Sequence, residues 1–217
     1  DVPAYYNDDQ FSQEFQMLYN GDRLSGVAGI YYLDGSADGA FDLLLSALGL
    51  TVYQAGKQDK ENFSVYGDFT YDVTDQWSVS LGGRFTKDET TADVTRELWL
   101  GMGSGSFDPT NTSSIFFVTQ TGYEGLNRED EEFTPRISVS YKPTDDLNIY
   151  ATYAQGFKAG GFDPRARADL DTLGLSQEGF GPEKVDSYEL GAKYATGPFS
   201  LSLSKATRCP RPCASAH

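Results

Sequence analysis

The sequence predicts an all-β chain whose antiparallel strands form part of an up-and-down transmembrane β-barrel. Successive runs of about ten residues alternate apolar and polar side chains, and a tilted strand of that length crosses a bilayer. The connections between the runs alternate short and long, which places tight turns at one rim and long loops at the other. A soluble β-sandwich would show the same alternation of faces, so the unequal rims are the stronger observation.

The expected strands form four hairpins with polar turns. Residues 11–20 and 23–33 meet at Asn20-Gly21-Asp22, and Asn-Gly strongly favours a hairpin turn. The other hairpins pair 62–73 with 76–87 through Thr74-Asp75, 133–142 with 147–157 through Pro143-Thr144-Asp145-Asp146, and 185–194 with 199–204 through Thr196-Gly197-Pro198. Two further strand pieces, 94–100 and 115–120, would bring the total to about eight to ten strands. The long loops are expected at 34–60, 88–131 and 156–184.

The strand expected at 76–87 illustrates the two faces. Its apolar face carries Trp77, Val79, Leu81, Gly83 and Phe85. Its polar face carries Ser78, Ser80, Gly82, Arg84 and Thr86. A polar face suits a watery lumen, and an apolar face suits lipid or a protein core. Aromatic residues gather near the strand ends, as in the girdles at two membrane interfaces: Tyr19, Tyr31, Tyr32, Tyr71, Trp77, Phe85, Tyr141, Tyr150, Tyr153 and Phe157.

The composition narrows the possible partners. The formal net charge of −15 argues against nucleic acid as a partner, because phosphate binding needs a basic surface. The longest apolar-rich run, 41–53, is shorter than the roughly 18 residues that a transmembrane helix needs. A membrane role must therefore rest on strands.

No motif indicates an enzyme, a metal site or a cofactor. The only histidine, His217, has no Ser/Asp or Cys partner pattern around it, and no two carboxylates are marked as an acid/base pair. Cys209 and Cys213 lack the spacing and further ligands of a zinc site, so they form a local disulfide or stay as two thiols. The aspartates of 34–42 loosely resemble a calcium loop, but Leu45 stands where the bidentate acidic ligand belongs.

The glycine-rich segment 156–165 is the best candidate for ligand contact. It combines a flexible backbone with aromatic and cationic side chains, which suits a ligand-facing lip at the outer mouth of a barrel. The alternative is a strand end with its aromatic belt. The candidate ligand-binding residues are Phe157, Lys158, Phe162 and Arg165 in this segment, with Arg84 and Arg136 on the lumen face as weaker candidates.

At these residues the chain resembles the TonB-dependent outer-membrane receptors. Residues 141–165, YKPTDDLNIYATYAQGFKAGGFDPR, are similar to their mid-to-late barrel signature, and 182–194, PEKVDSYELGAKY, to the following strand. Residues 12–20, 27–35 and 66–89 resemble successive barrel segments, so the likeness extends over about residues 11–204 in order.

The resemblance implies a Gram-negative outer-membrane location and a barrel of about 22 strands around an N-terminal plug domain. Such a receptor binds a scarce ligand outside the cell and imports it with energy from the inner-membrane TonB complex. A ferric siderophore is the expected ligand class, with cobalamin or a carbohydrate as alternatives, and outer-membrane lipid surrounds the barrel.

The resemblance also has limits. No plug or TonB-coupling segment is recognisable, so TonB contact is expected through a plug domain of the parent protein. We expect residues 1–204 to be the partial barrel and 205–217, TRCPRPCASAH with the preceding lysine and alanine, to be a non-barrel tail of artefactual origin. Alone, such a sheet would have open edges that cannot face lipid. The alternatives are a small passive porin or structural barrel, and a soluble β-sandwich binding module.

Overall fold

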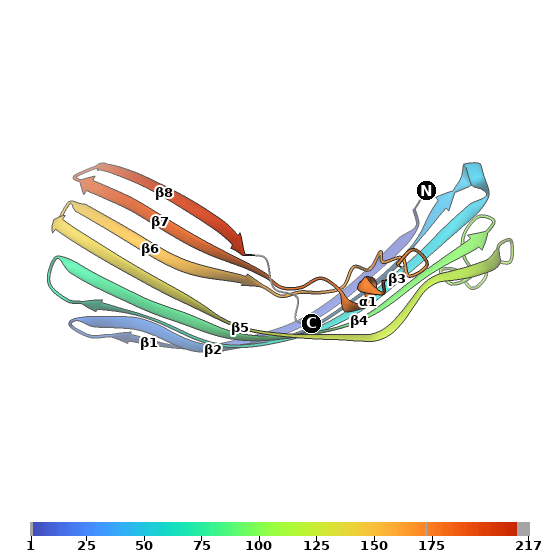
Figure 1. Cartoon of the computed structure of the whole chain (residues 1–217), viewed down its shortest axis with the longest axis horizontal. Helices are drawn as coiled ribbons and strands as arrows, with labels where there is room; N and C mark the ends of the chain where they lie inside the picture. Colours follow the sequence, from blue (N-terminus) through green and yellow to red (C-terminus); the bar gives the residue numbers. More distant parts are fainter. Residues whose placement is uncertain (1, 172, 212–217) are drawn as a thin grey trace.

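The computed structural model describes residues 2–171 and 173–211, which form one curved antiparallel sheet of eight strands in chain order (Figure 1). The strands are β1 (Ala4–Asn20), β2 (Leu24–Leu45), β3 (Leu50–Asp72), β4 (Trp77–Leu100), β5 (Ile115–Thr144), β6 (Leu147–Lys158), β7 (Glu183–Thr196) and β8 (Phe199–Arg211). Eight strands agree with the predicted partial barrel. A β-sandwich needs two packed sheets, so that alternative is wrong for the described residues.

All four predicted hairpins are present, and their tight turns lie at one rim of the sheet (Figure 1). In the first turn the Gly21 amide donates to the carbonyl of Leu24 at 2.8 Å. In the second, the Thr74 hydroxyl accepts from the amide of Trp77 at 3.0 Å. In the last, Gly197 adopts a φ of 53°, a conformation that glycine reaches without strain. The polar turn residues therefore specify the connections at this rim, as expected.

The predicted loop 34–60 is wrong, and the predicted loop 88–131 shrinks to 101–114, because the strands continue through the rest. The strand pieces predicted at 94–100 and 115–120 are confirmed as parts of β4 and β5. β2 and β3 pair from Asp34 opposite Glu61 up to Leu45 opposite Leu50, and only the 3₁₀ turn 46–48 joins them. β4 and β5 likewise pair up to Leu100 opposite Ile115. The halves of β2 to β5 that lie farther from the tight turns, which we call the upper halves, contain many charged and polar residues. Main-chain pairing tolerates such side chains where both faces of the sheet meet water. The third predicted loop is confirmed, since β6 ends at Lys158 and β7 begins at Glu183.

The last strand differs from expectation at its end. β8 continues to Arg211, seven residues beyond the predicted boundary at 204, and Arg211 stands opposite Lys184 in β7. Main-chain pairing with β7 does not require alternating side chains, which is why the sequence pattern did not reveal this extension. The division into 1–204 and a tail stays a prediction, and residues 212–217 lie outside the described residues.

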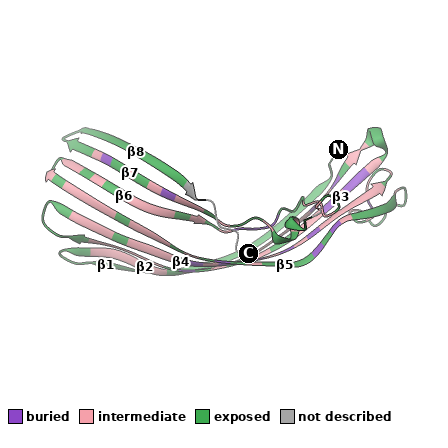
Figure 2. Ribbon diagram, viewed as in Figure 1, coloured by how far each residue is buried: buried purple, intermediate pink, exposed green. Residues whose placement is uncertain are grey.

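The register aligns apolar side chains in rows across the outer, convex face. One row runs through Phe15, Ile30, Val65, Phe85 and Phe133, each directly opposite the next on the neighbouring strand. All five side chains are at least 40% exposed. Figure 2 shows that buried residues are few and lie mainly in the long strands β3 to β5. The sheet therefore presents an uncovered apolar outer face.

The inner, concave face is polar and carries the loop 159–182, which contains the single turn of helix α1 (Leu175–Glu178) (Figure 1). The loop contacts β3, where the Gln54 side-chain amide donates to the carbonyl of Pro164 at 2.8 Å. Among the described residues, no helix has the length and apolar character needed to span a membrane.

Candidate functional site

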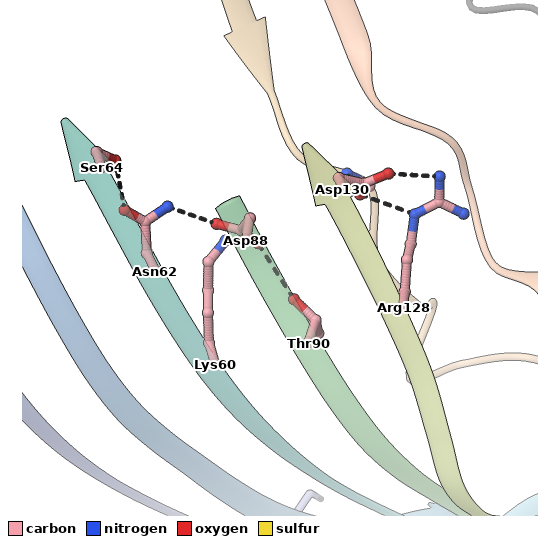
Figure 3. Close-up of polar contacts among 8 residues, drawn as sticks. Lys60, Asn62, Ser64, Asp88, Thr90, Arg128 and Asp130 are labelled. Carbon is pink, nitrogen blue, oxygen red and sulfur yellow. Dashed lines mark hydrogen bonds and ion pairs between the residues drawn. The ribbon is translucent and has the colours of Figure 1, made fainter. Parts of the chain in front are cut away.

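A polar network lines the inner wall where β3 and β4 run side by side (Figure 3). Asp88 is 4% exposed and accepts from the Asn62 side-chain amide at 2.9 Å, while the Lys60 ammonium lies 3.1 Å away. Ser64 donates to Asn62 at 3.0 Å and so extends the network along β3. A buried carboxylate is tolerated here because two donors compensate its charge.

Replacing Asp88 with alanine is expected to destabilise this wall. The change removes the acceptor of the Asn62 amide and the carboxylate partner of Lys60, at a cost of about 1–2 kcal/mol. A heat-modifiable gel shift measures the effect: samples are heated to increasing temperatures, and the temperature at which the fast-migrating folded barrel disappears is recorded. Glu124→Ala, an exposed carboxylate on β5, is the control and should leave that temperature unchanged. Equal temperatures for Asp88→Ala and the parent protein would contradict the prediction.

Arg84 extends from β4 into the same inner wall, as the alternation predicted. Its guanidinium donates to Ser64 at 2.9 Å and to Thr86 at 3.3 Å. It also lies 5.5 Å and 5.7 Å from the ring centroids of Tyr31 and Tyr66, within cation–π distance. Arg84 and Asp88 both line an open groove of about 510 Å³ on the inner face.

Arg136 lies on the inner face of β5 and forms an ion pair with Asp68, 2.7 Å apart. Its charge is therefore matched within the wall, whereas Arg84 is held by hydroxyl groups and aromatic rings. The two weaker candidate arginines therefore both lie on the inner face but differ in what holds them.

A second pocket, of about 450 Å³, lies under the start of loop 159–182. Residues 161–165 of the loop, which we name the arch, form one wall of this pocket. Phe162 is 8% exposed and lines it together with Pro164 and the exposed Arg165. The opposite wall consists of β1 to β4 and includes Tyr5, Tyr6, Phe41, Gln54 and Val94. Aromatic walls with few polar groups are typical of ligand pockets.

Two anchors tie the loop to β5. At the lower anchor, the amide of Gly160 donates to the Asp130 carboxylate at 2.9 Å. Asp130 also accepts two hydrogen bonds from the Arg128 guanidinium, each 2.9 Å long (Figure 3). At the upper anchor, the amide of Asp169 donates to the carbonyl of Gln120 at 3.2 Å.

The Thr121 side chain strengthens the upper anchor. Thr121 is 1% exposed, and its hydroxyl donates to the carbonyl of Ala166 at 2.7 Å. The same oxygen accepts from the amide of Ala168 at 3.0 Å. One buried hydroxyl thus satisfies two main-chain groups of a loop that makes no regular ladder there.

Three arginines, Arg96, Arg165 and Arg167, lie near the pocket, and the last of them forms an ion pair with Asp169, 2.6 Å away. Arg96 donates to Gln54, a pocket residue, at 2.8 Å. Burial lowers the pKa of Arg96, and the nearby Arg167 lowers it further, whereas Asp169 has the opposite influence. Arg165, at the pocket rim, forms an ion pair with the exposed Asp163. The pocket therefore combines an apolar body with charged residues of both signs, since Lys57 and Arg165 line it together with Asp38 and Asp93.

The structure brings together some of the predicted ligand residues and separates others. Phe162 and Arg165 line the pocket, and Arg84 lines the groove on the same inner face. Phe157 and Lys158 end β6, where they stand opposite Lys184 and Glu183, and they line neither cavity.

Sequence reasoning did not find the opposite wall of the pocket. Tyr5 and Tyr6 precede the first predicted strand, and Phe41 and Gln54 fell within a predicted loop. The adjacent tyrosines, placed before an alternating run, were the only available signal. Their place in the pocket wall opposite the arch depends on pairing between strands distant in sequence.

The residues that the sequence suggested as possible metal ligands or catalytic groups have other roles in the structure, or lie outside the described residues. The Asp42 carboxylate accepts from the amide and the hydroxyl of Ser104, at 2.6 Å and 2.7 Å. Within residues 2–171 and 173–211, no cluster of three or more metal-ligating side chains occurs. Cys209 is an exposed thiol on β8. Cys213 and His217 lie outside the described residues.

Solved structures share this fold. The ferric yersiniabactin uptake receptor FyuA from Yersinia pestis matches with a TM-score of 0.73 and 23% identity, over 94% of this chain and 29% of that chain. The siderophore receptor PiuA from Acinetobacter baumannii matches with a TM-score of 0.66 and 16% identity, over 94% of this chain and 32% of that chain.

Sequence comparison gives relatives of the same kind. The pesticin receptor of Yersinia pestis is 25% identical over 209 residues, which cover 94% of this chain and 26% of the receptor. The probable TonB-dependent siderophore receptor PiuA of Acinetobacter baumannii is 23% identical over 134 residues, which cover 62% of this chain and 15% of that protein. The chain thus spans about a quarter or less of the length of these relatives.

The family model described as TonB dependent receptor-like, beta-barrel matches residues 3–204, nearly the whole chain. This family consists of outer-membrane receptors, not enzymes, which confirms the outer-membrane location that the resemblance implied and the expected non-enzymatic role. With the eight-stranded sheet and its polar inner wall, the match shows that the chain belongs to the TonB-dependent receptor β-barrel family.

Proposed function

We propose that this chain forms part of the barrel wall and the ligand-binding mouth of an outer-membrane receptor that imports a ferric siderophore. The pocket under the arch carries the proposal, because it lies on the inner face and combines aromatic walls with charged side chains at its edge. A ligand that combines an apolar part with anionic groups, such as an iron chelate, fits such a site.

The relatives support this ligand class over cobalamin or a carbohydrate. The proteins with which the chain compares are described as receptors for pesticin and siderophores and as an uptake receptor for ferric yersiniabactin. In this proposal lipid contacts the outer face, and energy for import comes from TonB through a plug domain of the parent receptor.

Removing the Phe162 ring tests the pocket. In a full-length receptor that contains this chain, Phe162→Ala is expected to weaken binding of ferric yersiniabactin roughly tenfold or more. The reason is that the Phe162 ring is already a buried part of the pocket wall, and its truncation leaves a cavity that deforms the surface against which the ligand would pack. Titration of the purified receptor in detergent, followed by tryptophan fluorescence, measures the dissociation constant.

A matched control separates the pocket from the rest of the loop. Leu170→Ala removes a side chain that is 68% exposed in the same loop and does not line the pocket, so it should leave affinity unchanged. Equal affinity for Phe162→Ala and Leu170→Ala would exclude the pocket. Binding of cobalamin or maltotriose in place of the iron chelate would overturn the proposed ligand class.

A further inference from the structure

The far end of β5 exposes an uncharged apolar run. Ile115, Phe116, Phe117 and Val118 follow one another in the sequence, and all four are between 40% and 69% exposed. Successive side chains of a strand point to opposite faces, so both faces are uncovered here. We name residues 115–119 the tip strand. Contiguous exposed apolar side chains of this kind indicate a surface that binds a partner.

Lipid does not cover the tip strand. The tip strand lies at the end of the sheet opposite the tight turns (Figure 1). Thr119 is about 14 residue steps from Phe133, which belongs to the apolar row of the outer face. Those steps measure about 48 Å along a strand, or roughly 35 Å in height at a tilt of about 40°. The partner must therefore come from the water outside the cell.

One edge of the tip strand is open. On one side it pairs with β4, beginning at Ile115 opposite Leu100. On the other side β6 pairs with β5 only from Arg136 onward, and loop 159–182 reaches the main chain of β5 at the carbonyl of Gln120. In the part of the chain that the structure describes, the main-chain groups of the tip strand that face away from β4 thus have no ladder partner. Such an edge accepts an added strand through main-chain hydrogen bonds.

The rest of the barrel does not supply that strand. In an up-and-down barrel each strand has two neighbours, which precede and follow it in the chain. The neighbours of β5 are β4 and β6, and the chain contains both. The open edge therefore does not result from the limited length of the chain.

The tip strand is held firmly from the β4 side. The ring of Phe116 packs edge-to-face against Trp99, with 5.5 Å between the ring centroids. Thr51, which is 0% exposed, fixes the connection between β4 and β5. Its hydroxyl donates to the carbonyl of Gly101 and accepts from the amide of Gly103, both at 2.9 Å. A partner would therefore meet a surface that is already ordered, which lowers the entropic cost of binding.

The charge around the tip strand selects among partners. Segment 97–127 contains no lysine or arginine but three carboxylates, those of Glu97, Asp108 and Glu124. Asp108 and Glu124 are exposed, and Glu97 stands opposite Thr119 of the tip strand. A second copy of this chain would bring two acidic tips together, which is unfavourable, whereas a cationic partner would be attracted.

We propose that the tip strand is a docking edge for an extended segment of a cationic protein outside the cell. The segment adds to β5 as a further strand and pairs its main chain with the open edge. Its apolar side chains cover the exposed run, and its lysine or arginine side chains face the surrounding carboxylates. This docking edge is independent of the pocket under the arch.

A synthetic strand tests the docking edge. The probe is a fluorescein-labelled peptide of alternating valine and threonine with two lysines at each end. It is titrated against a full-length receptor that contains this chain, held in lipid nanodiscs, and fluorescence anisotropy gives the dissociation constant. Phe117→Ser should weaken binding at least tenfold, because it removes an apolar side chain from the run. Leu173→Ser, a change at a 77% exposed residue of loop 159–182, should leave the affinity unchanged. Equal affinity for the two variants would overturn the proposal.

Two further peptides test the mode of binding. A peptide with every backbone nitrogen of the valine–threonine stretch methylated cannot donate main-chain hydrogen bonds, and it should bind at least tenfold more weakly. Equal affinity would exclude an added strand. A peptide that ends in glutamates instead of lysines should also bind at least tenfold more weakly, and Glu124→Lys should reduce that preference. Equal binding of the lysine and glutamate peptides would exclude a cationic partner.

Hydrogen exchange shows whether the edge is free in the receptor itself. Amides of 115–119 that face away from β4 should exchange rapidly in the receptor alone and at least tenfold more slowly with the lysine peptide bound. Slow exchange without peptide would mean that another segment of the receptor occupies the edge. Exchange that slows as receptor concentration rises would mean that a second copy does. Either result would overturn the proposed partner.

Discussion

A receptor in which arginine replaces Leu81 is expected to fail to assemble in the membrane. Leu81 is 57% exposed on the outer face and lies midway along the strand between Trp77 and Phe85. The eight residue steps between these two aromatic side chains measure about 27 Å along a strand, or roughly 20 Å in height for a strand tilted by about 40°, which covers most of the apolar band of about 25 Å. Arginine at the middle of that band costs about 2–4 kcal/mol. Heat-modifiable mobility of the outer-membrane fraction on a gel measures assembly.

The outer face itself supplies the control, because its side chains change from apolar to acidic along the strands, away from the tight turns. Beyond Phe85 the row through Glu61, Glu89 and Glu129 is acidic, with Glu89 opposite each of the other two. Glu89→Arg therefore places the same arginine on the same strand and face among carboxylates, and normal assembly is expected. Equal assembly of Leu81→Arg and Glu89→Arg would show that lipid does not cover the band.

The parts of the fold that local chemistry determines were predictable. The period-two alternation gave the strands next to the tight turns, and the dipeptide Asn20-Gly21 marked its hairpin correctly. The upper halves of the long strands were not predictable. Segments such as 34–45 contain glycine, aspartate and serine without alternation, and they are strands only because β1 and β3 pair with them on both sides.

The candidate site shows the same division between local and distant signals. Aromatic and cationic residues in a glycine-rich segment indicated Phe162 and Arg165, which the structure places at the pocket. The fixed path of the loop depends on Asp130 and Thr121, which lie roughly 30–45 residues earlier in the chain. Asp130 belongs to an acidic run that, in the sequence alone, indicates a solvated surface.

Replacing Asp130 with alanine is expected to release the lower anchor of the loop. The carboxylate is 9% exposed, accepts from the amide of Gly160, and balances the charge of Arg128. A hydrogen bond to a charged group contributes about 1.5–3 kcal/mol, so the population of released loop should rise roughly tenfold or more. Trypsin cleavage after Arg165 and Arg167, followed over time by mass spectrometry, measures that population under conditions where the barrel stays intact.

The neighbouring glutamate provides a matched control, because it differs mainly in the face it occupies. Glu129 is an exposed carboxylate whose ion pair is with Lys87 on β4, 3.0 Å away, and it makes no contact with the loop. Since exposed ion pairs contribute at most about 1 kcal/mol, Glu129→Ala should leave the cleavage rate close to that of the parent receptor. Asp130→Asn retains an oxygen acceptor for Gly160 without the charge, so its rate should fall between the two. Cleavage of Asp130→Ala no faster than that of Glu129→Ala would mean that the contacts of Thr121 and Gln54 hold the loop without the lower anchor.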